Sequence, residues 1–226
     1  MNSFTLKLIA CIAMLIDHAT AIFVRDWPIY LIGRGIGRIA FPIFCFLIVE
    51  GYFHTSNVKK YLLRLGIFAL ISEIPFDYAL WDAAFMKTFY SYQNVFFTLF
   101  LGLLTITIYD YISKKYKGQF WILNFFAVIT IVIGGALSVL IKSDYDVRGI
   151  LMILVFYIFH WNKKAMAIAY ILLIGFLFGG LSILTIFALP FIWFYNGERG
   201  PKVKYAFYAF YPVHLLVLGF IARYFV

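Results

Sequence analysis

The chain opens with an apolar stretch at residues 4–24, FTLKLIACIAMLIDHATAIFV, that is long enough to cross a bilayer as a single helix. Three ionisable residues lie within it: Lys7, Asp17 and His18. An ionisable group at the membrane centre costs about 2.5–3.5 kcal/mol on insertion scales, so each of them needs a physical reason to be there. The spacing of Lys7 and His18 places them on one helix face, about 16 Å apart along the axis. We therefore expect a polar path through the membrane with an imidazole at its deep end.

The composition of the chain is typical of a polytopic membrane protein. Of its 226 residues, 65% are hydrophobic and only 13% are charged, and the mean hydropathy is +0.95. Long apolar runs without strict alternation predict an all-α transmembrane bundle, which we expect to form a single domain over residues 1–226. About nine spans are expected, with a range of eight to ten. They are residues 4–24, 36–53, 61–80, 92–112, 119–141, 147–161, 165–179, 181–195 and 205–225.

The stretch between the first two spans, RDWPIYLIGRGIGR at residues 25–38, contains one proline and three glycines. We expect it to be an interfacial or re-entrant piece rather than a plain loop.

Basic residues decide the expected orientation. The net charge is +9, but the basic residues are scattered between spans, so we expect no nucleic-acid partner. On alternate sides of these spans, twelve of the 19 Lys and Arg residues fall on the side of the N-terminus and seven on the other. The positive-inside rule then places the N-terminus in the cytoplasm and, for nine spans, the C-terminus outside.

Several other classes of site have no support in the sequence. Cys11 and Cys45 both lie inside expected spans, so neither a disulfide framework nor a zinc site is predicted. Two short motifs, LIAC at residues 8–11 and ATA at residues 19–21, resemble processing sites, but charged residues interrupt the apolar stretches before them. We expect cleavage at neither. No nucleotide-binding loop, serine elbow or metal-ligand spacing is present, and no metal is expected.

Three further pairs of ionisable residues are spaced i,i+4 at or inside span ends, so each pair shares a helix face. In lipid, such groups turn inward, pair with one another or border water. They either contribute to a functional site or join helices and anchor them at the headgroup level. The pairs are Arg34 with Arg38, Glu50 with His54, and Glu73 with Asp77.

His18 is the principal catalytic candidate, because an imidazole exchanges protons near neutral pH. Asp17 either stabilises the charged imidazole or pairs with an arginine while another acid orients His18, since adjacent helical residues point about 100° apart. A second histidine, His214, follows Pro212 in the last expected span. Pro212 is expected to kink that span. His214 is either a further site residue or a histidine that only joins helices.

Three segments resemble the TraX family, whose name-giving member is associated with N-terminal acetylation of conjugative pilin. They are LKLIACIAMLIDHATAIF, GRIAFPIFCFLIVEGYFHTSNVKKYLLRLGIFALISEIPFD and KYAFYAFYPVHLL. The resemblance extends from end to end and is strongest over residues 5–77. The Lys7-x10-His18 spacing is also similar to the basic-x10-His signature of the wider acyltransferase-3 group.

The resemblance implies an acetyltransferase of a bacterial inner membrane, with Asp17 and His18 as its catalytic residues. Acetyl-CoA would dock at the basic cytoplasmic face and extend its pantetheine arm toward His18, which would act as general base or as nucleophile. Arg34 and Arg38 would stabilise the thioester oxyanion or bind the acceptor. The cations implied at the acetyl-CoA site are Lys7, Arg34, Arg38, Lys59, Lys60 and Arg64. Glu50, His54, Glu73, Asp77 and His214 remain further site candidates.

The acceptor stays open: a peptide N-terminus such as that of a pilin-like protein, an amino sugar or an envelope glycan would suit the same chemistry. Two rival functions also remain. Intramembrane His, Asp and Glu side chains could form the proton relay of a transporter, or the same charges could only pair the helices of a non-catalytic assembly factor.

Overall fold

The computed structural model describes residues 1–80, 92–201 and 203–225, and within them the protein is an assembly of helices without a β-strand beyond one isolated bridge between Gln93 and Ser143. The predicted all-α class is therefore confirmed. The elements are α1 (Ser3–Phe23), α2 (Trp27–Gly37), α3 (Ala40–His54), α4 (Val58–Leu80), α6 (Val95–Lys115), α7 (Phe120–Leu140), α8 (Asp146–Ile158), α9 (Lys163–Leu177), the 3-10 helix η1 (Gly180–Ala188), α10 (Leu189–Trp193) and α11 (Lys204–Tyr224).

Each predicted span corresponds to one of these elements or to a consecutive pair, with ends that differ by a few residues apart from the second span. Within the described residues, five helical stretches are long and apolar enough to cross a membrane by length and composition. They are 3–23, 27–54, 95–115, 120–140 and 205–224. The chain is thus a polytopic membrane protein built as a helical bundle.

Residues 27–37 form helix α2, so the stretch at residues 25–38 is not a plain loop, as the sequence predicted. The apolar helical stretch that includes α3 begins at Trp27, earlier than the second predicted span. Asp26 caps α2 by accepting a hydrogen bond from the Ile29 amide at 3.2 Å, and Pro28 lies in the first turn, where its missing N–H is not needed. Only a short break at Arg38 and Ile39 separates α2 from α3. The two arginines of α2 pair with one carboxylate from α1.

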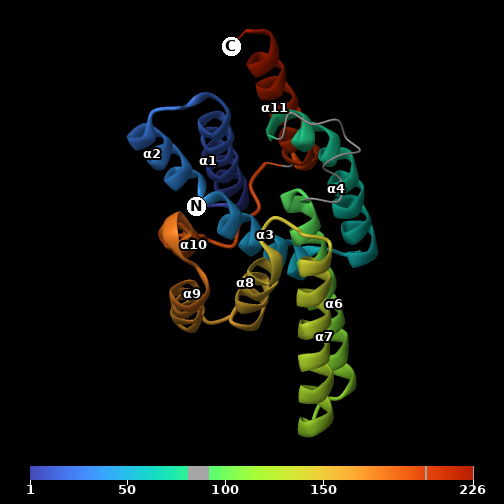
Figure 1. The fold of residues 1–226 in the computed structure, drawn as a ribbon. Helices are drawn as coiled ribbons and strands as arrows, with labels where there is room; N and C mark the ends of the chain where they lie inside the picture. Colours follow the sequence, from blue (N-terminus) through green and yellow to red (C-terminus); the bar gives the residue numbers. More distant parts are fainter. Residues whose placement is uncertain (81–91, 202, 226) are drawn as a thin grey trace.

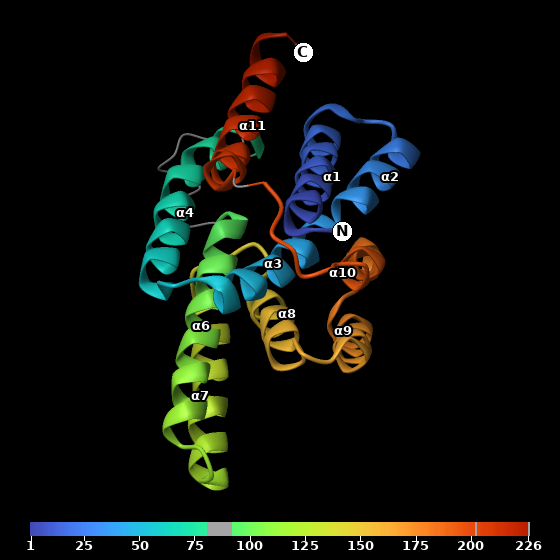
Figure 2. The same ribbon diagram turned by 180° about the vertical axis from the view of Figure 1, so that it is seen from behind.

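α1 packs against α2, α3 and α11, while α4 lies along α11 and α6. α6 and α7 form an antiparallel hairpin that extends away from α1, α2 and α11 (Figures 1 and 2). α8 fills the centre, where it contacts α3, α6, α7 and α9. Its buried side chains Ile150, Met152 and Phe156 are fully enclosed. The core therefore lies where α3, α6 and α8 meet.

The outer surface of α7 is suited to lipid. Large apolar side chains along it are exposed, among them Phe125, Val128 and Val132. Its small and polar residues, including Gly134 and Ser138, are instead buried. A Cβ atom at Gly134 would collide with Thr105 of α6, so the glycine permits the close approach of the two helices. An apolar face turned outward and a small-residue face turned inward are typical of a membrane helix.

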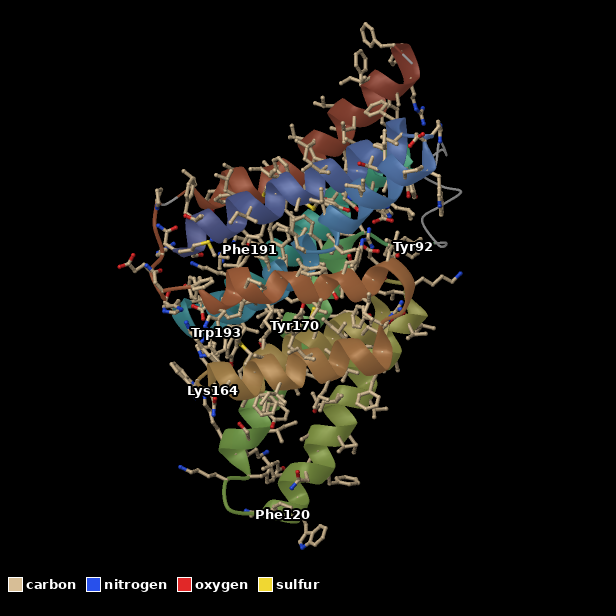
Figure 3. The ribbon with its side chains drawn as sticks, turned by 90° about the vertical axis from the view of Figure 1, so that its left-hand side faces the viewer. Tyr92, Phe120, Lys164, Tyr170, Phe191 and Trp193 are labelled. Carbon is tan, nitrogen blue, oxygen red and sulfur yellow. The ribbon has the colours of Figure 1, made fainter. Side chains whose placement is uncertain are left out.

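The two ends of the bundle differ in the residues they carry. Figure 3 shows Lys164 and Trp193 at one end, Tyr92 at the opposite end, and Tyr170 between them. The first end is where α1, α4, α9 and α11 begin and where α3, α6 and α8 finish. We call it the N-terminal end, and Lys59, Lys60, Lys163 and Lys164 lie there, at the starts of α4 and α9.

Candidate active site

Asp17 on α1 is held between two arginines of α2. Arg34 Nη1 lies 2.8 Å from Asp17 Oδ2, and Arg38 Nη2 lies 2.9 Å from Asp17 Oδ1. Of the two arrangements open from sequence, the structure shows the one in which Asp17 pairs with arginine. Gly37 makes this possible, because a Cβ atom there would collide with the Asp17 side chain. The Asp17 carboxylate is hydrogen-bonded to Arg34 and Arg38, and the hydrogen-bond partner of the His18 ring is not Asp17.

His18 is oriented by a second histidine rather than by an acid. His18 Nδ1 lies 2.7 Å from Nε2 of His214 on α11, and the two rings are nearly parallel, with centroids 5.0 Å apart. The ring of Tyr211 meets both imidazoles edge-on, at 6.0 Å from His18 and 5.7 Å from His214. The structure thus brings together two predicted candidates that are 196 residues apart in the chain. The sequence left open whether a further acid orients His18; among the described residues, the hydrogen-bond partner of its ring is His214.

A cavity of about 520 Å³ leads from the N-terminal end toward this pair of histidines. Four basic side chains line it near that end: Lys7, Lys60, Arg64 and Arg199. Its deeper wall is apolar and aromatic and includes Met14, Phe96, Leu99 and Tyr211. His18 and His214 do not line it themselves. Met14 is one turn before His18 on α1, and the Tyr211 ring separates the cavity from the imidazoles.

The structure sorts the predicted cofactor cations into three groups. Lys7, Lys60 and Arg64 line the cavity, with Lys7 Nζ 5.6 Å from the ring centroid of Phe207. Lys59 is exposed and is not part of the lining. Arg34 and Arg38 form the third group, at the opposite side of the histidine pair, bound to Asp17. Arg199, which sequence reasoning counted only as a loop cation, joins the first group.

Glu50, a predicted candidate on α3, is the centre of a second polar cluster at the mouth of the cavity. Its Oε1 lies 2.6 Å from His160 Nε2, and its Oε2 accepts a hydrogen bond from the Tyr195 hydroxyl at 3.0 Å. The expected partner His54 instead donates from Nδ1 to the Glu50 backbone oxygen at 2.8 Å, with the carboxylate farther away at 3.7 Å. We call Glu50, His160 and Tyr195 the mouth cluster.

Sequence reasoning missed His160 and Tyr195 because they lie 110 and 145 residues from Glu50. The only local signal was a histidine, His160, at the end of an expected span.

The remaining predicted pair, Glu73 and Asp77, is buried on α4 away from the cavity lining. Glu73 Oε2 accepts a hydrogen bond from the Asn94 side chain at 2.5 Å, while Asn94 also caps the first turn of α6. Glu73 and Asn94 therefore connect α4 to α6, which is the helix-joining role that sequence left open for this pair.

One titratable group outside the spans faces the arginines. Asp144 lies in the turn between α7 and α8 and accepts a hydrogen bond from the Tyr92 hydroxyl at 2.5 Å. Burial raises the pKa of Asp144 above its ordinary value, and the Tyr92 hydrogen bond and the nearby Arg38 charge only partly offset this. Within the described residues, no group of three His, Cys, Asp or Glu side chains is placed to hold a metal ion.

Comparison with known proteins agrees with this architecture. A family model described as TraX protein matches residues 3–222. A probable fimbrial assembly protein FimC, serogroup H1, of Dichelobacter nodosus is 34% identical over 248 aligned residues, which cover 96% of this chain and 94% of that protein. No solved structure matches the chain significantly. Because the family model spans nearly the whole sequence and the relative is similar over nearly its full length, the chain belongs to the TraX family.

Proposed function

We propose that this protein is a bacterial inner-membrane acetyltransferase that carries an acetyl group from cytosolic acetyl-CoA to an acceptor at the His18–His214 pair. The observation that carries the proposal is the cavity, which connects a basic mouth to the aromatic wall against the two imidazoles. The association of the family's name-giving member with pilin acetylation agrees with it.

The chemistry of the cavity suits a long, amphipathic acyl donor. Coenzyme A carries phosphates at one end and a thioester at the other, so it needs cations at an entrance and an uncharged channel beyond. Lys7, Lys60, Arg64 and Arg199 would bind the phosphates through charge-assisted hydrogen bonds. The aromatic and aliphatic wall would accept the pantetheine arm. Lys7 and His18, about 16 Å apart along α1, mark the two ends of that path.

In the proposed reaction, His18 removes a proton from the acceptor as the acceptor attacks the thioester carbonyl. The carbon–sulfur bond breaks, a bond between the acetyl carbon and the acceptor forms, and the departing sulfur takes up the proton that His18 holds. Tyr211 separates the cavity from the imidazoles, so its ring would need to turn aside when the thioester arrives. Arg34 and Arg38 would act at a distance, because Asp17 occupies both.

The proposed orientation follows from the same end of the molecule. An N-terminus in the cytoplasm would put the basic mouth where acetyl-CoA is available and would match the excess of Lys and Arg on that side. The acceptor would then reach the histidines from the outer half of the membrane. A surface or pilin-like peptide is the acceptor class that the fimbrial assembly relative favours, and an amino sugar or glycan would suit the same chemistry.

One observation favours a second candidate, a non-catalytic membrane assembly factor. The relative is described as a fimbrial assembly protein, and many of the buried polar contacts here join one helix to another, as Asp17 and the two arginines do. A proton-coupled transporter remains a third possibility, and it would need proton movement that depends on a substrate.

The test uses purified protein in lipid nanodiscs with acetyl-CoA labelled in the acetyl group. We expect saturable binding and slow hydrolysis, with water as a substitute acceptor. His18→Ala should lower the hydrolysis rate about 10²- to 10⁴-fold, the usual contribution of a general base. Binding of acetyl-CoA should persist, because His18 does not line the cavity.

Failure of the wild-type protein to bind coenzyme A at all would exclude the enzyme and leave the assembly factor. Substrate-dependent proton flux in liposomes, without acetyl transfer, would point to the transporter.

A further inference from the structure

The hydrogen-bonding groups around His214 determine which of its ring nitrogens carries hydrogen. His214 Nδ1 lies 2.7 Å from the backbone oxygen of Phe210, one turn earlier on α11. A carbonyl oxygen can only accept, so Nδ1 of His214 must be the donor. In a neutral imidazole the other nitrogen then has no hydrogen. Nε2 of His214 is therefore an acceptor.

His18 must match this acceptor. Its Nδ1 is 2.7 Å from His214 Nε2, so His18 Nδ1 carries the hydrogen and donates it. The hydrogens on both Nδ1 atoms are thus assigned from the donors and acceptors around the two rings. With Nδ1 protonated, neutral His18 has its lone pair on Nε2, at the opposite edge of the ring.

The packing around the two rings keeps this arrangement in place. The ring of Phe210 stacks on His214 with centroids 4.7 Å apart, and Tyr211 meets both imidazoles edge-on. The planes of His18 and His214 differ by only 4°, which suits a hydrogen bond in the shared plane of their ring nitrogens. Beside the pair, Asp17 balances only one of the two charges of Arg34 and Arg38, so this group keeps a net positive charge.

We propose that His214 is a positioning residue that, through the Phe210 carbonyl, fixes His18 in the tautomer whose Nε2 is the basic nitrogen of the acetyl-transfer reaction. This inference rests on the proposed function for its catalytic meaning, while the tautomer itself can be tested without any activity.

The proposed pair differs from one in which a carboxylate orients the histidine, because His214 is uncharged. When His18 Nε2 takes the acceptor's proton, the new positive charge sits on His18 and can pass through the shared hydrogen bond to His214. The same proton equivalent then returns through His18 Nε2 to the sulfur of coenzyme A. The pair begins and ends neutral, so no net charge remains inside the membrane after a turnover.

The direct test is nitrogen-15 NMR of protein labelled in its histidine rings. The four histidines are assigned by single substitution, and long-range couplings distinguish a protonated from an unprotonated ring nitrogen. We expect His18 to be protonated at Nδ1 and unprotonated at Nε2. A His18 signal protonated at Nε2, or at both nitrogens at neutral pH, would overturn the proposal whether or not the protein transfers acetyl groups.

Two substitutions of nearly equal polarity separate positioning from a general structural role. In His214→Gln the amide oxygen can stand near the position of Nε2 and accept from His18. In His214→Asn the amide stands near Nδ1, one bond too short to reach His18. We expect the Gln variant to keep the His18 tautomer and acetyl-CoA hydrolysis within about 10-fold, and the Asn variant to lose about 10²-fold in kcat with little change in KM.

Equal losses in the Gln and Asn variants would overturn the positioning role. If the wild-type protein shows the expected tautomer and the expected response to both substitutions by NMR, but neither binds nor hydrolyses acetyl-CoA, the proposed function fails while the assignment of the histidine pair stands.

Discussion

The His18–His214 pair and the mouth cluster each place a half-buried histidine against a partner from a distant helix, but the partners differ in charge. At the mouth, His160 faces the carboxylate of Glu50 at 2.6 Å. Beyond the deep wall of the cavity, His18 Nδ1 faces the imidazole Nε2 of His214 at 2.7 Å. A carboxylate only accepts a hydrogen bond from its histidine, whereas a second imidazole can accept through one nitrogen and donate through the other. The His18–His214 pair is therefore suited to passing a proton along its hydrogen bond, and the mouth cluster to holding structure.

What the mouth cluster holds is the segment 194–201, which contributes Tyr195 to the cluster and Arg199 to the cavity lining. The same segment is fastened elsewhere as well. The N-terminal amine of Met1 donates to the Phe194 oxygen at 2.7 Å, and the Ser3 amide donates to the Glu198 oxygen at 2.8 Å. The first residues of the chain and the segment before α11 therefore meet at the cavity entrance.

The largest loss of stability is expected where the ion pairs beside the His18–His214 pair are broken. Asp17→Asn leaves Arg34 and Arg38 without their carboxylate in a buried position, which costs about 3–5 kcal/mol when one partner of a buried ion pair is lost. The melting temperature in detergent should fall accordingly. Glu198→Gln, at an exposed carboxylate, serves as the matched control and should leave the melting temperature unchanged. An Asp17→Asn protein as stable as wild type would mean that the arginines have another source of compensation.

A smaller loss is expected at the mouth. Glu50→Gln weakens the contacts to His160 and Tyr195 and should destabilise the protein by about 1–3 kcal/mol. Because the segment 194–201 also carries Arg199, the KM for acetyl-CoA should rise while kcat stays within about two-fold of the wild-type value. The readouts are thermal melting and steady-state hydrolysis. A fall in kcat at unchanged KM would instead assign the catalytic role to the mouth cluster and not to the His18–His214 pair.

The smallest effects separate two neighbouring lysines. Lys60 lines the cavity and Lys59 does not, although both are exposed at the start of α4. Lys60→Ala should raise the KM for acetyl-CoA about 10-fold, equivalent to one charge-assisted hydrogen bond, and the difference should shrink as salt is added. Lys59→Ala should change KM less than about two-fold. Lys117→Ala, on the same end of the molecule but at the α6–α7 turn, is the control for net charge. Equal responses to the two neighbouring substitutions would argue against a phosphate site in the cavity.

The sequence determined the spans and the residues that share a face on each helix. Both depend on local quantities, namely the length of an apolar run and the 3.6-residue period, so the predicted spans and the common face of Lys7 and His18 could be read from short stretches. The exception was α2, which the prediction largely left out of the second span because of its arginines and glycines. The carboxylate that pairs with those arginines lies on another helix, at Asp17.

Only the tertiary structure decided which candidates meet. His18 and His214, and likewise Glu50, His160 and Tyr195, are joined across more than a hundred residues of sequence. The same is true of the cavity, whose lining comes from α1, α3, α4, α6, α11 and the segment before α11. Helical periodicity fixes the direction in which a side chain points from its helix axis, but not which neighbouring helix lies in that direction. Helix packing decides which helix that is, and here it placed a second histidine, His214, beside His18.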